Sequence, residues 1–152
     1  MKHLSLSGLC LLSILFSTFL SAQEIIPVNE PNYRRALLFK SLPEKVTLED
    51  AKLNSLLNVT EGNIVKIEMG SSAIEGKVIS AVNKYNNIRS VVIRSSNFNG
   101  ATLTLSSSTR RDGTVKISGR LISIQHGDLY ELEKQNDKYV LVKKNYYDLI
   151  NE

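Results

Sequence analysis

Apolar and polar residues alternate with a period of two over much of the chain. Val65, Ile67 and Met69, for example, alternate with Lys66 and Glu68. Because successive side chains of a strand point to opposite faces, this pattern predicts strands with one buried face. The same alternation recurs over residues 74–78, 101–105 and 115–119.

Two stretches depart from this simple alternation. Residues 91–93 form a continuous apolar run, which predicts a strand buried on both faces. Near Leu121 the apolar phase changes, because Ile122 and Ile124 continue it on the opposite parity. We therefore expect a bulge or bend beside Gly119, a device by which a sheet curls.

Turn residues separate the predicted strands. Asn99–Gly100 and Asp112–Gly113 are dipeptides that favour tight hairpins, and further turns are expected at His126–Asp128 and Gln135–Asp137. The spacing corresponds to about seven short strands, one every 8–15 residues or so. The predicted fold class is mainly β: an antiparallel barrel or sandwich with one short helix near the N-terminus.

The helix is expected from Thr47 to about Asn58. Thr47 is the expected N-cap, and Asp50 places a negative charge in the first turn. The residues on or near its apolar face are Leu48, Ala51, Leu56 and Leu57.

The segments that flank this pattern are less regular. Residues 23–45 form an irregular lead, because Pro27 and Pro31 disfavour regular structure there. Within the lead, Arg34–Phe39 either pairs as a short strand or lies as an arm. Residues 146–150 are too apolar for a free tail, so we expect them to dock on the sheet.

The first 22 residues have the order of a secretory signal peptide. A short basic start with Lys2 precedes the apolar run Leu9–Leu20, and small residues follow at Ser21–Gln23. The run has about 12 residues and a membrane-spanning helix needs about 20, which favours a cleaved signal over an uncleaved anchor. We expect cleavage after Ala22 or Gln23 and a secreted or periplasmic protein that is soluble after signal removal. The predicted organisation is a signal peptide (1–22), the irregular lead (23–45) and a single β-rich domain (46–152).

Residue chemistry excludes several kinds of site. Cys10 is the one cysteine and leaves with the signal, so the mature domain is cysteine-free and has no disulfide. His126 is then the one histidine, which excludes a zinc site built from several histidines. Without a Gly-x-Ser-x-Gly elbow, we interpret His126 as a solvent-exposed turn residue. Asp112 and Asp128 likewise suit turns better than a calcium loop, so we expect no enzyme activity, cofactor or metal.

Charge and loop composition narrow the expected partners. The formal charge of +4 falls by one when Lys2 is removed, and the basic residues are spread along the chain. A nucleic-acid-binding protein concentrates them in a stripe, so no nucleic-acid partner is expected. The predicted protein-binding loop residues are the turn aromatics Tyr85 and Phe98 and, in another turn, the consecutive arginines Arg110 and Arg111.

The order of strand and turn residues from Leu56 to Val142 resembles a known family. The matching stretches are Glu61–Asn63, Ser90–Ile93, Gly100–Leu105, Asp112–Gly113, Gly119–Ile122, Tyr130–Leu132 and Tyr139–Leu141. They are similar to the β-rich propeptide region of secreted reprolysin-like metallopeptidases. The peptidase motif His-Glu-x-x-His is missing, so the resemblance implies a stand-alone domain of propeptide-like shape. The Ser21–Gln23 ending also resembles the signals of exported proteins from Bacteroidetes-type bacteria.

Three functions compete at this point. The leading one is an exported, non-catalytic module that binds a protein or an envelope component, with a partner or inhibitor of a secreted peptidase as its special case. The alternative is a small-ligand carrier with a pocket inside a β-barrel. A hydrolase comes third because so few catalytic groups are available. The inward positions are mostly Val, Ile and Leu, which favours a filled interior and hence the binding module.

Overall fold

A computed structural model describes residues 35–146 and Leu149. The predicted signal peptide and residues 23–34 lie outside this part of the chain, as do Tyr147, Asp148 and Ile150 of the C-terminal segment. Tyr146, the first residue of that segment, is buried. Among the described residues, no helix combines the length and the apolar character that crossing a bilayer would require.

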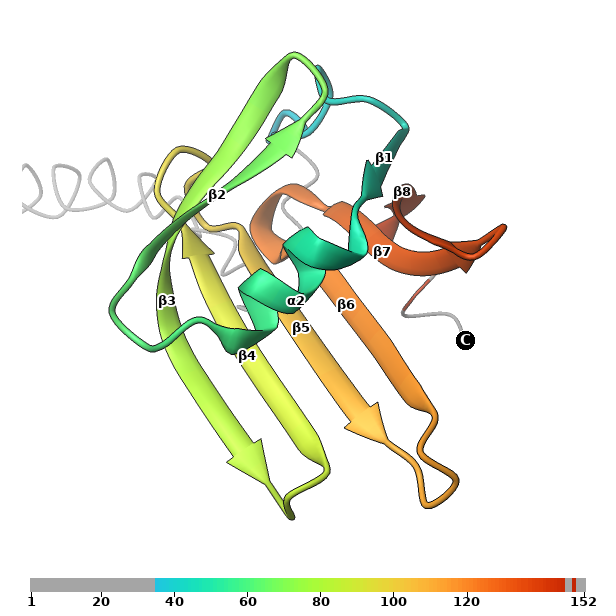
Figure 1. Cartoon of the computed structure of the whole chain (residues 1–152). Coiled ribbons are helices and arrows are strands. Elements are labelled where there is room, and N and C mark those ends of the chain that lie inside the picture. The colour runs from blue at the N-terminus through green and yellow to red at the C-terminus, as the bar shows by residue number, and fades with distance from the viewer. Residues whose placement is uncertain (1–34, 147–148, 150–152) are drawn as a thin grey trace, which may run out of the picture.

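Eight antiparallel strands form one curved sheet in the described part of the chain (Figure 1). They are β1 (Lys45–Leu48), β2 (Ile64–Met69), β3 (Ser72–Lys84), β4 (Ile88–Ser95), β5 (Thr102–Thr109), β6 (Val115–Ser123), β7 (Asp128–Gln135) and β8 (Lys138–Asn145). The helical elements that the structure describes in full are α2 (Asp50–Asn58) and the 3-10 turn η1 (Ile124–His126).

The sheet curls into a nearly closed barrel. Its strand order is β1-β8-β7-β6-β5-β4-β3-β2, so every strand from β2 to β8 pairs with its neighbour in the chain. Only β1 pairs with a distant strand, β8, and β1 and β2 form the two edges. Of the two predicted architectures, the barrel is therefore the observed one.

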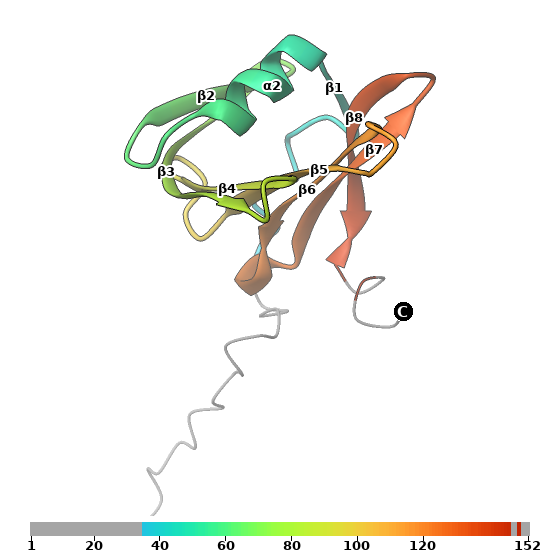
Figure 2. The same cartoon turned by 60° about the horizontal axis from the view of Figure 1, so that its bottom comes forward.

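The helix α2 covers the gap between the two edges. It connects β1 to β2 in the chain and lies over β4 and β5 on the concave side of the sheet (Figure 2). Leu53, Leu56 and Leu57 are its buried residues. Arg89 of β4 ties the C-terminal end of the helix, because its guanidinium donates to the Leu57 and Val59 carbonyl oxygens at 2.7 and 2.8 Å.

The helix starts later than the sequence predicted. Thr47 is not the N-cap, because Lys45–Leu48 forms β1, paired with Tyr139–Val142 of β8. Glu49 occupies the N-cap position without a capping side-chain hydrogen bond. Val46 and Leu48 are buried, whereas Lys45 and Thr47 are exposed, so a four-residue alternation was mistaken for a helix start. β1 is also the strand that the sequence analysis missed when it predicted about seven strands. Within the helix, Ala51 was expected on the apolar face but is exposed.

The period-two prediction holds best on β5. Leu103 and Leu105 are buried and Thr104 between them is exposed. On β6 the inward positions open toward solvent, since Ile117 is half-buried and Val115 is 52% exposed. The run at residues 91–93 is buried on one face only, because Val92 is partly exposed between buried Val91 and Ile93.

The predicted bulge beside Gly119 was wrong. The pairing of β5 with β6 runs without a break from Thr102 with Ile122 to Thr109 with Val115. The inward phase also continues past Gly119, because Leu121 and Ser123 are both buried. A polar Ser123 at an inward position made the apolar phase look reversed. The register shift lies instead in β3, between Val78 and Ser80.

Gly119 has a packing role rather than a bending one. A Cβ at this position would lie 2.6 Å from Leu105 Cδ2 and 3.1 Å from the Thr104 carbonyl oxygen. Such distances are shorter than van der Waals contact, so any side chain would displace its neighbours. Glycine therefore allows β6 to pack closely against the core residues of β5.

Candidate functional site

The candidate site is the end of the barrel where the β3–β4 and β5–β6 hairpins project (Figure 1). We call residues 84–88 and 109–116 the hairpin end. Two hydrogen bonds join the two tips: the Thr109 amide donates to the Asn87 carbonyl at 2.8 Å, and the Asn87 side-chain amide donates to the Thr109 carbonyl at 3.3 Å. The two loops therefore form one connected surface, with an open recess lined by Asn86–Ile88 and Ser108–Arg111.

Tyr85 is held in an uncommon backbone conformation at this end. Its φ is +54°, and the next residue, Asn86, has φ +57°. Left-handed backbone is common for glycine and asparagine but costly for a bulky aromatic residue. The side chain is 79% exposed, and the Lys84 ammonium lies 5.1 Å from its ring centroid. The fold thus presents a large aromatic ring to solvent beside a cation.

Arg110 and Arg111 project from an ordered turn. The Arg110 amide donates to the Thr114 carbonyl at 2.8 Å, and the Gly113 amide donates to the Arg110 carbonyl at 3.0 Å. The Thr114 amide donates to Asp112 Oδ1 at 2.9 Å, and this hydrogen bond lowers the pKa of the Asp112 carboxyl. Both arginines are exposed, and neither guanidinium forms an ion pair with another residue that the structure describes.

The strand register adds two lysines that the sequence reasoning missed. Lys84 pairs with Ile88, Ile88 with Ser108, and Ser108 with Lys116. These four residues form one row across the sheet, so both lysines stand on the same face beside the recess. The hairpin end then carries four cations and one carboxylate, Asp112. Nothing in the local sequence of either lysine signals this, because only the pairing register brings them into one row.

Phe98 does not belong to the hairpin end. It lies in the β4–β5 connection and packs against the core, with its ring centroid 5.7 Å from that of Phe39 in an edge-to-face arrangement. Of the four predicted loop residues, the structure thus brings together Tyr85, Arg110 and Arg111 at one end of the barrel. Phe98 is a packing residue at the other end of β4.

His126 and Asp128 bind the segment that precedes β1. His126 ends η1 directly before the left-handed Gly127, so the predicted turn is present, but the residue is part-buried rather than fully exposed. Its Nδ1 lies 2.8 Å from the Ala36 carbonyl oxygen. The Asp128 carboxylate is 5% exposed and accepts the amides of Leu38 at 2.7 Å and Phe39 at 3.0 Å. Asp128 is therefore an anchor for a distant segment rather than a turn residue.

We call residues 35–44 the arm, and they contain no helix or strand. For Arg34–Phe39 the sequence predicted either a short strand or an arm. The described part of that segment, residues 35–39, forms an arm. Phe39 and Leu42 of the arm are buried in the core. The Phe39 ring lies 5.6 Å from that of Tyr130, whose hydroxyl donates to the Pro43 carbonyl. The Lys143 ammonium donates to the Leu42 carbonyl at 2.7 Å and pairs with Glu44 at 3.0 Å. The arm is thus part of the folded domain.

The described residues were also compared with the requirements of a metal-binding site. Within residues 35–146 and Leu149, no three His, Cys, Asp or Glu side chains are arranged to hold a metal ion. Asp128, the one buried carboxylate among the described residues, accepts backbone amides of the arm with both oxygens. The hairpin end remains as the arrangement with unpaired charge and an exposed aromatic ring, which suits binding.

Asp128→Asn should destabilise the fold by about 2 kcal/mol, the scale of hydrogen bonds to a buried charged group. An asparagine keeps one acceptor oxygen and directs an NH2 group at the second arm amide. Urea unfolding of the mature domain measures the change. Asp112→Asn, at the exposed turn, is the matched control and should change stability much less. Equal losses for the two variants would contradict the anchoring role of Asp128.

Stability should also depend on Tyr130 at high pH. Burial, with smaller contributions from Glu44 and Asp128, raises the pKa of Tyr130 to about 12, from an unfolded value near 10. The folded chain therefore favours the neutral phenol, so this contribution is intact below pH 10 and is lost as pH rises toward 12. The unfolding free energy of Tyr130→Phe should fall less steeply than that of the wild type between these values. Parallel pH profiles would contradict this role.

Comparison with known proteins leaves the function to be argued from this geometry. No protein-family model, no curated protein and no solved structure matches the chain.

Proposed function

We propose that this protein is an exported, non-catalytic binding module whose hairpin end binds an acidic surface of a partner protein. The observation that carries the proposal is the joined pair of hairpin tips, on which Tyr85 is exposed in a left-handed conformation beside unpaired cations. Backbone strain of this kind persists where surrounding structure holds it, and it is concentrated at functional sites.

The chemistry of the hairpin end favours an acidic protein. Arg110 and Arg111 offer planar guanidinium groups that bind carboxylates in a bidentate manner. Tyr85 supplies a rigid aromatic surface with little side-chain entropy to lose, a residue type enriched in binding hot spots. The recess between the tips lies beside both groups and can accept a side chain of the partner.

The interior of the barrel favours a binding module over a ligand carrier. Tyr130, Phe39 and Leu105 are at most 1% exposed and occupy the centre that a carried molecule would need. The core continues through the buried leucines of α2, which cover the concave side. An apolar ligand would have to displace these side chains, so the outer surface is the better place for recognition.

Export and the peptidase link complete the proposal. The order of residues 1–22 supports a cleaved signal peptide and hence a partner outside the cytoplasm. The propeptide-like order of strand residues supports, as a special case, a secreted peptidase as that partner. An acidic surface on such an enzyme would complement the cations of the hairpin end.

Charge reversal tests the site. Arg110→Glu combined with Arg111→Glu should reduce retention of the partner from secreted and envelope proteins about tenfold, because like charges then face each other. Lys40→Glu combined with Lys138→Glu makes the same change in net charge at exposed positions elsewhere and should leave retention unchanged. Retention should also fall with rising salt. Equal effects of the two double variants, or a nucleic acid as the retained species, would contradict the proposal.

Tyr85→Gly tests whether the strain serves binding. Glycine adopts the observed φ freely, so the unfolding free energy should rise by up to about 1 kcal/mol. Partner retention should fall at the same time, because the aromatic ring is gone. Tyr85→Phe should preserve both values approximately. A Tyr85→Gly variant that is more stable and binds as well as the wild type would show that Tyr85 does not take part in binding.

A further inference from the structure

The barrel has a second open feature, the fork at which β7 leaves β6. The β5–β6 ladder spans eight residue pairs, from Thr102–Ile122 to Thr109–Val115. The β6–β7 ladder spans four and stops at the pair Arg120–Glu131. Toward the hairpin end, Val115–Ser118 therefore has a strand partner on the β5 side only, as far as the structure describes the chain.

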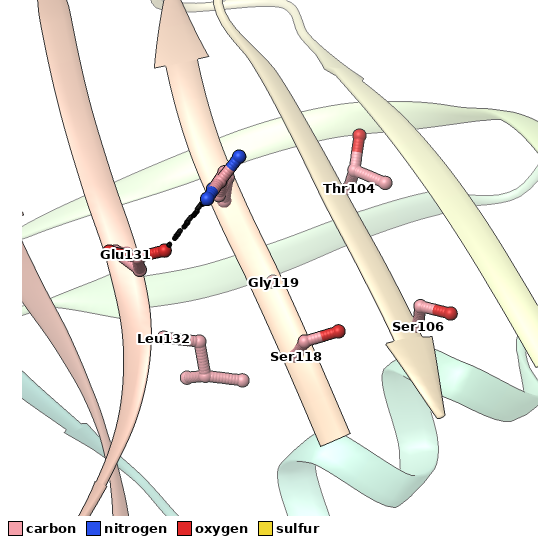
Figure 3. A pocket seen from close by; sticks show the side chains of 7 residues that line it. Thr104, Ser106, Ser118, Gly119, Glu131 and Leu132 are labelled. Carbon is pink, nitrogen blue, oxygen red and sulfur yellow. Dashed lines mark hydrogen bonds and ion pairs between the residues drawn. The ribbon is translucent and has the colours of Figure 1, made fainter. Parts of the chain in front are cut away.

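The fork forms a groove on the convex face of the sheet (Figure 3). Thr104, Ser106 and Ser118 line it, and the ion pair between Arg120 and Glu131 closes its upper end with atoms 3.1 Å apart. Gly119 still lies against Leu132, because a Cβ on it would be 3.5 Å from Leu132 Cβ. Below this contact the two strands separate, and the side of β6 that faces away from β5 is open.

Backbone groups at this open side can pair with another strand. In an antiparallel sheet, alternate residues direct their N–H and C=O groups to opposite neighbours. Some of those groups in Val115–Ser118 therefore point away from β5, where no other strand of the described chain pairs with them. An unpaired edge of this kind is the surface that proteins use to add a peptide strand.

The side chains of β6 indicate the chemistry of the added strand. On the convex face, Lys116 is exposed and forms no ion pair with another described residue. On the concave face, Val115 is 52% exposed and Ile117 is half-buried. A neighbouring strand would place alternate side chains beside these two rows, so acidic residues would meet Lys116 and apolar residues would cover Val115 and Ile117.

We propose that the open edge of β6 binds an extended peptide of alternating acidic and apolar residues by strand addition. This goes beyond the proposed function, since it concerns the strand edge and backbone pairing rather than the loop arginines. A second copy of the chain is a poorer occupant. Its own open segment, Val115–Ser118, carries Lys116 and no carboxylate, so two paired copies would bring two cations together.

A synthetic peptide tests strand addition on the mature domain. The probe is a capped heptapeptide of alternating glutamate and valine, titrated into labelled protein and followed by NMR. Amide hydrogen exchange at alternate residues of 115–118 should slow on binding. The same peptide with lysine in place of glutamate should bind about tenfold more weakly, because it places cations beside Lys116.

N-methylation of the probe separates backbone pairing from simple charge attraction. One version carries N-methyl groups on the valines and the other on the glutamates. Only one set of peptide N–H groups faces β6 in an added strand, so one version should lose at least about tenfold in affinity and the other should keep it. Lys116→Glu should weaken binding of the unmodified probe, and Lys138→Glu should not.

The outcomes are distinct from those of the hairpin-end proposal. Arg110→Glu combined with Arg111→Glu should leave exchange protection at 115–118 intact when the probe is bound. Equal affinity of the two N-methylated probes, or no saturable binding at millimolar probe, would overturn strand addition. A dimer of the free protein with the same amides already protected would overturn it too, in favour of a second copy.

Discussion

The buried carboxylate of Asp128 is the interaction on which one end of the barrel depends. It stands at the first residue of β7 and accepts two backbone amides from the arm. A buried carboxylate without partners would be strongly unfavourable, and arm amides without an acceptor would be nearly as costly. Each therefore needs the other, which makes the arm and the barrel one cooperative unit.

This contact also places the aromatic core. With the arm fixed at Leu38 and Phe39, the Phe39 ring reaches both Phe98 and Tyr130, and Tyr130 reaches the Pro43 carbonyl. The arm thus fills the end of the barrel that the β4–β5 connection borders. Because the chain returns from the arm into β1, the same contact also sets the edge strand against β8.

The barrel is completed by a helix rather than by hydrogen bonds between its edges. β1 and β2 are the outer strands, and α2 spans the concave side between them with three buried leucines. Arg89 fixes its C-terminal end from within the sheet. The helix covers only part of the concave side, and β3–β6 run on to the hairpin end (Figure 1). Both proposed binding features, the hairpin tips and the open edge of β6 at Val115–Ser118, belong to this extension, where side chains are more exposed.

The local pattern predicted what depends on backbone geometry alone. Alternation at Leu103, Thr104 and Leu105 identified a strand and its buried face, because successive side chains in a strand point to opposite faces whatever the partner. Asn99–Gly100 and Asp112–Gly113 predicted hairpins, because the glycines adopt the positive φ that the turns require. The mainly β barrel class followed from these two signals, although Thr47 and Ser123 misled the prediction where a short alternation or a buried polar residue weakened the pattern.

The candidate site shows the limit of that information. Tyr85, Arg110 and Arg111 could be selected from the sequence as unusual turn residues, but their meeting at one end follows from the antiparallel order of β3 to β6. Lys84 and Lys116 lie beside them because of the register of three strand pairings. Asp128 binds the arm, which lies ninety residues earlier in the chain. By itself the sequence predicted most of the strands and the turns between them, and the export signal stays a prediction. Which distant residues meet was decided by the tertiary structure, because pairing register and packing depend on the whole sheet and not on neighbouring residues.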